Sequence, residues 1–169
     1  MKGQEHEISI EAQLDDKENI LQINQRIIYH NNSDSTFTEI YFHDWANGYK
    51  NIKAPLSRRL IEDYDKSLYF ASEKDRGYTA ISNLTVNFET VSFFELENNQ
   101  IDVIKIQLNQ PLKPRDSVEI NIAYKVKIPN AKFTSYGKTK TGYHLRYWYL
   151  SPAVFKNDWK IMSNLNMDD

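Results

Sequence analysis

The sequence predicts an all-β fold, an antiparallel two-layer β-sandwich with a saddle-like shape and one short surface helix. Apolar and polar residues alternate with a period of two along most of the chain, as in strands with one buried face. Turn residues recur about every 8 to 12 positions, a spacing typical of sandwiches. Only one segment has helical spacing. The 169 residues therefore predict a single domain of about seven to nine strands.

The first two strands are expected to form a hairpin. Residues 8–14 alternate between apolar and polar, and residues 21–29 continue the alternation after the turn at Asp15-Asp16-Lys17. A second hairpin is expected from residues 91–97 and 101–108, because the asparagines between them tolerate the left-handed backbone of a tight turn. Further strand-like alternation covers residues 39–45 and 84–88.

The clearest strand covers residues 118–128 and ends at Pro129. Its alternation predicts that Ile120, Ile122, Tyr124 and Val126 point into the core.

One helix is predicted over residues 55–64. Pro55 suits the first helical position, where its missing N–H costs nothing. Leu56, Leu60 and Ile61 form an apolar stripe, and oppositely charged pairs stand four residues apart. We expect this helix to lie on the surface as part of a loop.

Composition excludes several classes of function. The 21 Lys and Arg nearly balance the 23 Asp and Glu, so no general positive field attracts nucleic acid, although basic positions between Lys125 and Arg146 leave a local patch conceivable. The chain has no cysteine, which excludes disulfides and thiolate sites and fits a reducing compartment or a bacterial periplasm. No apolar stretch is long enough to predict a transmembrane segment.

No residue pattern predicts catalysis or metal binding in this chain. The four histidines, His6, His30, His43 and His144, lack the spacing of a zinc helix. There is no Gly-x-Ser-x-Gly motif, and the carboxylates fall in turns, on the helix or along one strand face. We therefore predict no catalytic residue, no metal ligand and no cofactor for this chain.

The aromatic run at residues 142–159 is the strongest functional signal. It contains far more aromatic residues than the last segment of a domain normally does, and aromatic surface of this extent is usually covered by a binding partner. Core packing, a carbohydrate platform and domain docking all remain open from the residues alone. The position of the run near the end of the chain favours docking. The candidate contact residues are Tyr147, Trp148, Tyr149, Phe155 and Trp159.

The order of these segments resembles the N-terminal β-domain of the aminopeptidase N-like (gluzincin) zinc metallopeptidases, especially their bacterial branch. The resemblance covers nearly the whole chain. It rests on residues 6–15, 27–33 and 40–49, on Arg76-Gly77, on residues 108–114 and 127–129, and on the exit from Trp148-Tyr149 through Ala153-Val154-Phe155 to Trp159.

This resemblance implies that residues 1–169 are a non-catalytic N-terminal domain, with a catalytic domain following in a longer protein. The following domain would hold the zinc and cleave peptides, while this one helps to wall the substrate cleft. The resemblance also implies a periplasmic or extracellular bacterial protein whose signal peptide has been removed.

Three positions depart from the family pattern. Arg115 stands at a usual turn glycine, Pro152 comes two places late, and Tyr147 lies nearest to a substrate-binding glutamine of some relatives. The rival hypothesis is an independent carbohydrate- or protein-binding module that uses the aromatic run.

Overall fold

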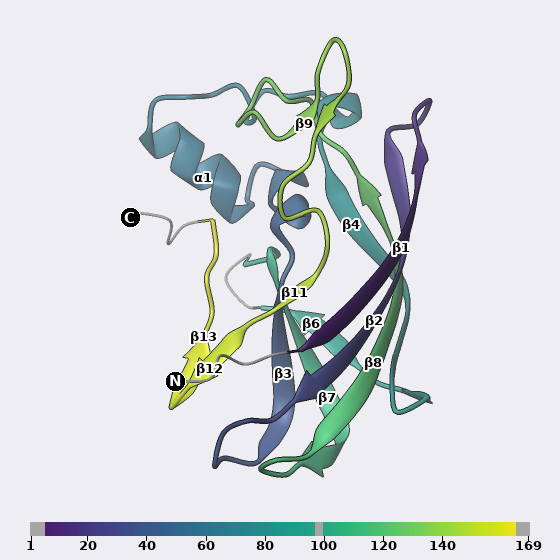
Figure 1. Cartoon of the computed structure of the whole chain (residues 1–169). Helices are drawn as coiled ribbons and strands as arrows, with labels where there is room; N and C mark the ends of the chain where they lie inside the picture. The colour runs from purple at the N-terminus through teal and green to yellow at the C-terminus, as the bar shows by residue number, and fades with distance from the viewer. Residues whose placement is uncertain (1–5, 97–99, 165–169) are drawn as a thin grey trace.

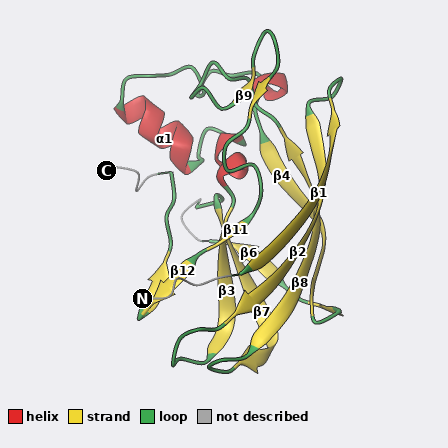
Figure 2. Ribbon diagram, viewed as in Figure 1, coloured by secondary structure: helices red, strands yellow, loops and turns green. Residues whose placement is uncertain are grey.

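Two antiparallel sheets face each other in the computed structural model, which describes residues 6–96 and 100–164 (Figure 1). Strands make up 47% of the described residues and helices 10%, which confirms the predicted all-β sandwich (Figure 2). Among the described residues, no helix is both long and apolar enough to cross a membrane.

The first sheet has five strands and contains the predicted N-terminal hairpin. In spatial order its strands are β1 (Glu7–Asp15), β2 (Ile20–His30), β8 (Ser117–Lys127), β4 (Tyr78–Val86) and β5 (Glu89–Thr90). The long strand β8 lies at its centre, paired with β2 on one side and β4 on the other.

The second sheet has four strands and contains the second predicted hairpin. Its spatial order is β11 (Ser151–Pro152), β3 (Phe37–His43), β7 (Val103–Leu112) and β6 (Phe93–Glu95). Strands β6 and β7 pair antiparallel as expected, while residues 97–99 of the predicted hairpin lie outside the described residues.

The core lies between the two sheets. The four residues of β8 predicted to point inward are buried, with exposed fractions of 0% for Ile120, 2% for Ile122 and Tyr124, and 1% for Val126. Ile40 and Phe42 of β3 meet them from the second sheet and are fully buried. Period-two alternation therefore located the buried face correctly.

Strand β1 differs from the expectation of one buried face. Ile8 and Leu14 lie opposite Ile27 and Leu21 of β2 and so share the core-facing side, yet they are 40% and 42% exposed. Because β1 is the edge strand of the larger sheet, the smaller sheet leaves part of its apolar face uncovered. Ile10 alone packs partly against the core.

The segment between β3 and β4 contains three short helices. They are the 3₁₀ helix η1 (Trp45–Tyr49), the α-helix α1 (Pro55–Glu62) and the 3₁₀ helix η2 (Glu73–Asp75). Strand β3 ends at His43, earlier than predicted, because Asp44 caps η1 by accepting a hydrogen bond from the Asn47 N–H.

Helix α1 starts at Pro55 as predicted and ends at Glu62, two residues before the expected end. Its first turn is buried, and Leu56 joins a small second core with Tyr49, Phe133 and Tyr136. The helix is thus partly buried and fixes the segment after β3 against the loop after β8.

Two short hairpins complete the chain. They are β9 (Gly137–Lys138) with β10 (Tyr143–His144), and β12 (Val154–Lys156) with β13 (Asp158–Lys160). Gly137 has a φ of 130°, and a Cβ there would lie 2.2 Å from the Pro129 carbonyl oxygen. Only glycine fits this close approach, which holds the first hairpin against the end of β8.

Candidate functional site

The aromatic run covers the free edge of the second sheet. Ser151 and Pro152 pair with the end of β3, and the Ala153 N–H donates to the Tyr41 carbonyl at 2.8 Å. The chain then continues to the β12–β13 hairpin beside Phe37 and returns to the same end of β3, where the Met162 N–H donates to Nε2 of His43 at 3.0 Å. The yellow end of the ribbon in Figure 1 follows this path.

A buried clamp holds the middle of the run on the first sheet. The Gln25 side-chain amide donates to the Leu150 carbonyl at 2.7 Å, and the Leu150 N–H donates to the Tyr124 hydroxyl at 3.2 Å. That hydroxyl in turn donates to Oε1 of Gln25 at 2.6 Å. Both backbone groups of Leu150 are thereby satisfied inside the core.

Gln25 was not among the residues singled out from the sequence, although a signal exists. It occupies an inward position of β2 between Ile23 and Ile27, where the alternation calls for an apolar residue, and it is 2% exposed. A polar residue in such a position needs a buried partner.

Phe155 and Trp159 lie at the lower end of the run, opposite each other in the β12–β13 hairpin. The Trp159 ring centroid lies 4.9 Å from that of Phe37 and 5.4 Å from that of Tyr41. Phe155 lies 4.7 Å from Phe37. Both rings are half-buried, so they close the sandwich beside β3.

Trp148 and Tyr149 come shortly before β11 in the run, and both are half-buried. Their rings are nearly perpendicular, with centroids 5.5 Å apart and planes at 76°. Trp148 packs against both hydrophobic cores. It is therefore a packing residue in this chain.

Tyr147 is the exposed member of the predicted set, at 65%. Its backbone is left-handed, with a φ of 50°, which is unfavourable for a bulky residue. Its ring lies 6.1 Å from Trp45, which stacks on His43 at 5.6 Å. The strained backbone thus presents Tyr147 at the surface beside η1.

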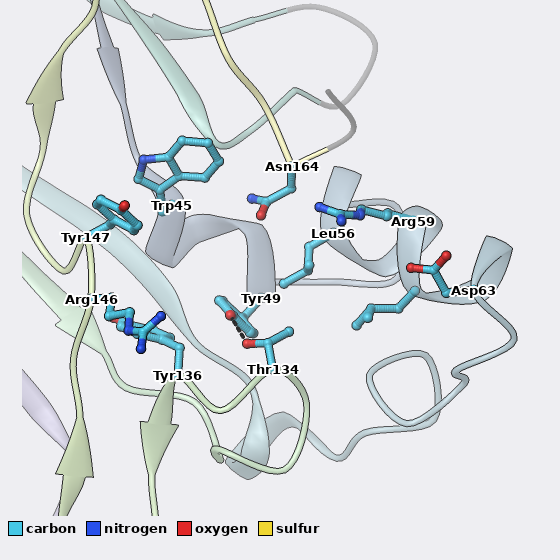
Figure 3. Close-up of a pocket in the computed structure, with 11 residues that line it drawn as sticks. Trp45, Tyr49, Leu56, Arg59, Asp63, Thr134, Tyr136, Arg146, Tyr147 and Asn164 are labelled. Carbon is cyan, nitrogen blue, oxygen red and sulfur yellow. Dashed lines mark hydrogen bonds between the residues drawn. The ribbon is translucent and has the colours of Figure 1, made fainter. Parts of the chain in front are cut away.

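Beside Tyr147 lies a pocket of about 300 Å³, a size at the lower end of ligand sites (Figure 3). Four segments form it, namely η1, α1, the loop after β8 and the segment after β10, together with Asn164, the last described residue. The lining residues are Trp45, Tyr49, Leu56, Arg59, Leu60, Asp63, Thr134, Tyr136, Arg146, Tyr147 and Asn164.

A polar network fixes η1 beneath the pocket. Asp44 accepts hydrogen bonds from the Thr79 hydroxyl at 2.6 Å and from the Asn47 N–H at 3.3 Å. Asn47 donates to the Ile101 carbonyl at 2.6 Å. Burial and, to a smaller extent, the neighbouring Asp102 and Glu95 carboxylates raise the pKa of Asp44 to about 7 despite these hydrogen bonds.

Asn164 ties the end of the described chain to the same network. Its backbone N–H and side-chain amide donate to Oδ2 of Asp102 at 2.6 and 2.9 Å. A Cβ at Gly48 would lie 2.6 Å from the Asn164 amide nitrogen, so glycine at position 48 permits this approach. Burial raises the pKa of Asp102 as well.

Within residues 6–96 and 100–164, no group of three or more His, Cys, Asp or Glu side chains could hold a metal ion. The rings of the half-buried Trp45 and the exposed Tyr147 are tilted by 45°, so together they do not form one flat platform for a sugar ring. The surface instead combines an apolar pocket with an exposed ring.

Comparisons with known proteins gave structural likeness only. No family model matches the sequence, and no curated protein matches it. The chain is similar to a two-domain M1 zinc metallopeptidase mutant bound to L-tryptophan, with 10% identity over 75% of this chain and a TM-score of 0.44.

Two further solved structures come from Deinococcus radiodurans. One is an M1 zinc metallopeptidase mutant bound to a Tyr-Ser-Ala substrate, with 9% identity and a TM-score of 0.44. The other is an M1 zinc metallopeptidase, with 8% identity and a TM-score of 0.39. Each likeness covers 75% of this chain, and the chain spans 20% of the length of each of these proteins.

Proposed function

We propose that this chain is the non-catalytic N-terminal domain of a zinc aminopeptidase-like metallopeptidase. The surface at the His43 end of β3, formed by Tyr147, Trp45 and the adjacent pocket, contacts a following catalytic domain of the same protein and helps to wall that domain's substrate cleft. Zinc and peptide hydrolysis belong to the catalytic domain. This chain contributes shape and contact area.

The observation that carries the proposal is the division of the aromatic run. Trp148, Phe155 and Trp159 are packed against this chain's own cores. Tyr147 is held outward by a left-handed backbone, beside a largely apolar pocket. Exposed aromatic surface next to a pocket is typical of a contact site.

The order of motifs along the sequence supports the same proposal. The segment that resembles the family's Trp-x-Asn-x-Tyr sequence, residues 45–49, forms η1 and lines the pocket with Trp45 and Tyr49. Tyr147 immediately precedes the segment that resembles the family's exit. Two residues about 100 positions apart in the chain, Trp45 and Tyr147, thus meet on one surface.

The rival carbohydrate-binding function requires rings that lie in one plane. The Trp45–Tyr147 pair is tilted by 45° and the Trp148–Tyr149 pair by 76°. A surface of this shape suits side chains of another protein domain better than a sugar ring.

Truncating Tyr147 tests the proposal. We expect Tyr147→Ala to lower the free energy of unfolding of the longer protein by about 1 to 2 kcal/mol more than that of the 169-residue chain, because only the longer protein loses an interdomain contact. Urea denaturation of both lengths, with and without the substitution, measures this difference.

Phe88→Ala provides the matched control. Phe88 is also exposed, at 81%, and also has a positive φ, 67°, but it lies in the β4–β5 turn. Phe88→Ala should change the free energy of unfolding of the 169-residue chain and of the longer protein equally. Equal effects of Tyr147→Ala in the two lengths would refute the docking role, and a following sequence without a His-Glu-x-x-His helix would refute the metallopeptidase assignment.

A further inference from the structure

We propose that the pocket between η1, α1 and the loop after β8 binds a small ligand made of an apolar ring and a terminal carboxylate. All of the lining residues belong to the described part of this chain, so binding can be tested on the 169-residue chain, without the domain that the proposed function places against the same surface.

The interior of the pocket suits an apolar ring. Trp45, Tyr49, Tyr136 and Tyr147 supply aromatic surface, and Leu56 and Leu60 supply aliphatic surface. A volume of about 300 Å³ accommodates one ring and a short chain. In Figure 3, Trp45, Tyr147 and Arg146 lie at one end of the pocket, whereas Arg59 and Asp63 lie on the side of α1, so a ligand that extends from the aromatic rings toward α1 meets Arg59 there.

The charged side chains that line the pocket favour an anionic ligand. Arg59 and Arg146 both line the pocket, and no carboxylate of the described residues lies within 4.0 Å of either guanidinium. Asp63, which caps the end of α1, also lines the pocket, but it forms no ion pair with Arg59. Two positive charges against one negative charge leave the lining with a net charge of +1.

Arg59 is the principal anchor for the carboxylate. Its side chain is half-buried, whereas Arg146 is exposed, so the Arg59 guanidinium is less solvated and gains more from an anion. A guanidinium binds a carboxylate through two parallel hydrogen bonds, which fixes the orientation of the ligand.

The test uses 3-phenylpropionate as the probe and its amide as the neutral analogue. Titration calorimetry on the 169-residue chain should give a dissociation constant on the order of 0.1 to 1 mM for the carboxylate and at least about 5-fold weaker binding for the amide. Binding of the carboxylate should also weaken with added salt. Equal binding of the two probes, or no binding, would overturn the proposal.

Substitutions then locate the site. Arg59→Ala should weaken binding of 3-phenylpropionate by about 10-fold, because the paired hydrogen bonds are lost. Arg58→Ala is the matched control, since Arg58 is exposed on the same helix and does not line the pocket. Equal affinity in the two variants would refute the role of Arg59.

A measurement on the unsubstituted chain guards against a variant that fails to fold. The indole N–H signal of Trp45 in the proton NMR spectrum should shift on addition of 3-phenylpropionate, because Trp45 lines the pocket. That of Trp159, at the other end of β3, should not shift. A shift of Trp159 without one of Trp45 would place binding elsewhere and overturn the proposal.

Discussion

The C-terminal segment is held in opposite ways at its two ends. At the lower end of β3, Trp159 and Phe155 pack on Phe37 through ring contacts. At the upper end, the returning chain is held by hydrogen bonds, from Met162 to His43 and from Asn164 to Asp102. One short segment thus combines an apolar attachment with a polar one.

The difference bears on where function can reside. Ring packing is insensitive to pH and fills space, so the lower end leaves little room for a partner. The polar end keeps two buried carboxylates, Asp44 and Asp102, whose pKa values are raised by burial. The pocket and the exposed Tyr147 are both found at this end.

Trp159→Ala should have the largest effect on stability. The substitution removes ring contacts to Phe37, Tyr41 and Phe155, and we expect a loss of about 3 kcal/mol in the free energy of unfolding. Urea denaturation at pH 5 and pH 8 should give the same loss, because no charge is involved.

Val154→Ala in the same hairpin serves as the control, since Val154 is 44% exposed and should contribute well under 1 kcal/mol. A loss for Trp159→Ala no larger than that of the control would contradict the apolar attachment.

Gln25→Leu should have the next largest effect. It leaves the Leu150 carbonyl without its donor and the Tyr124 hydroxyl without its acceptor inside the core, at a cost of about 2 kcal/mol. Gln22→Leu tests the same chemical change on the exposed face of β2 and should change stability by less than about 0.5 kcal/mol. If the two substitutions cost the same, the clamp does not stabilise the run.

Asp44→Asn should reveal the pH dependence of the polar end. The pKa of Asp44 is about 7 in the folded chain and 3.8 ordinarily, so the unfolded chain loses this proton first as pH rises. The Asp44 contribution to stability is therefore full below about pH 4 and is lost progressively up to about pH 7.

Asparagine does not titrate, so the variant should gain about 2 kcal/mol relative to the natural chain between pH 5 and pH 8. Denaturation curves of both proteins at the two pH values measure this gain. Asp16→Asn, at an exposed turn, controls for net charge. A constant difference across the pH range would show that Asp44 is ionised throughout.

The sheets could be predicted from the sequence because a buried strand face repeats every second residue. The alternating burial from Ile120 to Val126 follows that rule. The turn between β1 and β2 was predicted separately, from its Asp and Lys residues. The exposure of Ile8 and Leu14 could not be predicted, because it depends on how far the opposite sheet extends. Local pattern carries no information on that extent.

The candidate site was predicted only in part. The aromatic run directed attention to Tyr147, but nothing in its sequence distinguishes it from the packed Trp148. The pocket needs Trp45, Arg59 and Tyr136, which come together only through the tertiary fold. Asp44 and Asp102 resemble ordinary solvated carboxylates in the sequence, and only their burial makes them unusual.

The clamp around Leu150 has a consequence for amide hydrogen exchange. The Leu150 N–H is bonded to a hydroxyl deep in the core, so it can exchange with solvent only when the two sheets separate. Tyr147, three residues earlier, is exposed and should exchange through local fluctuations. Leu150 thus marks the point at which the C-terminal run becomes part of the cooperative folding unit, and everything a partner touches at Tyr147 lies just outside it.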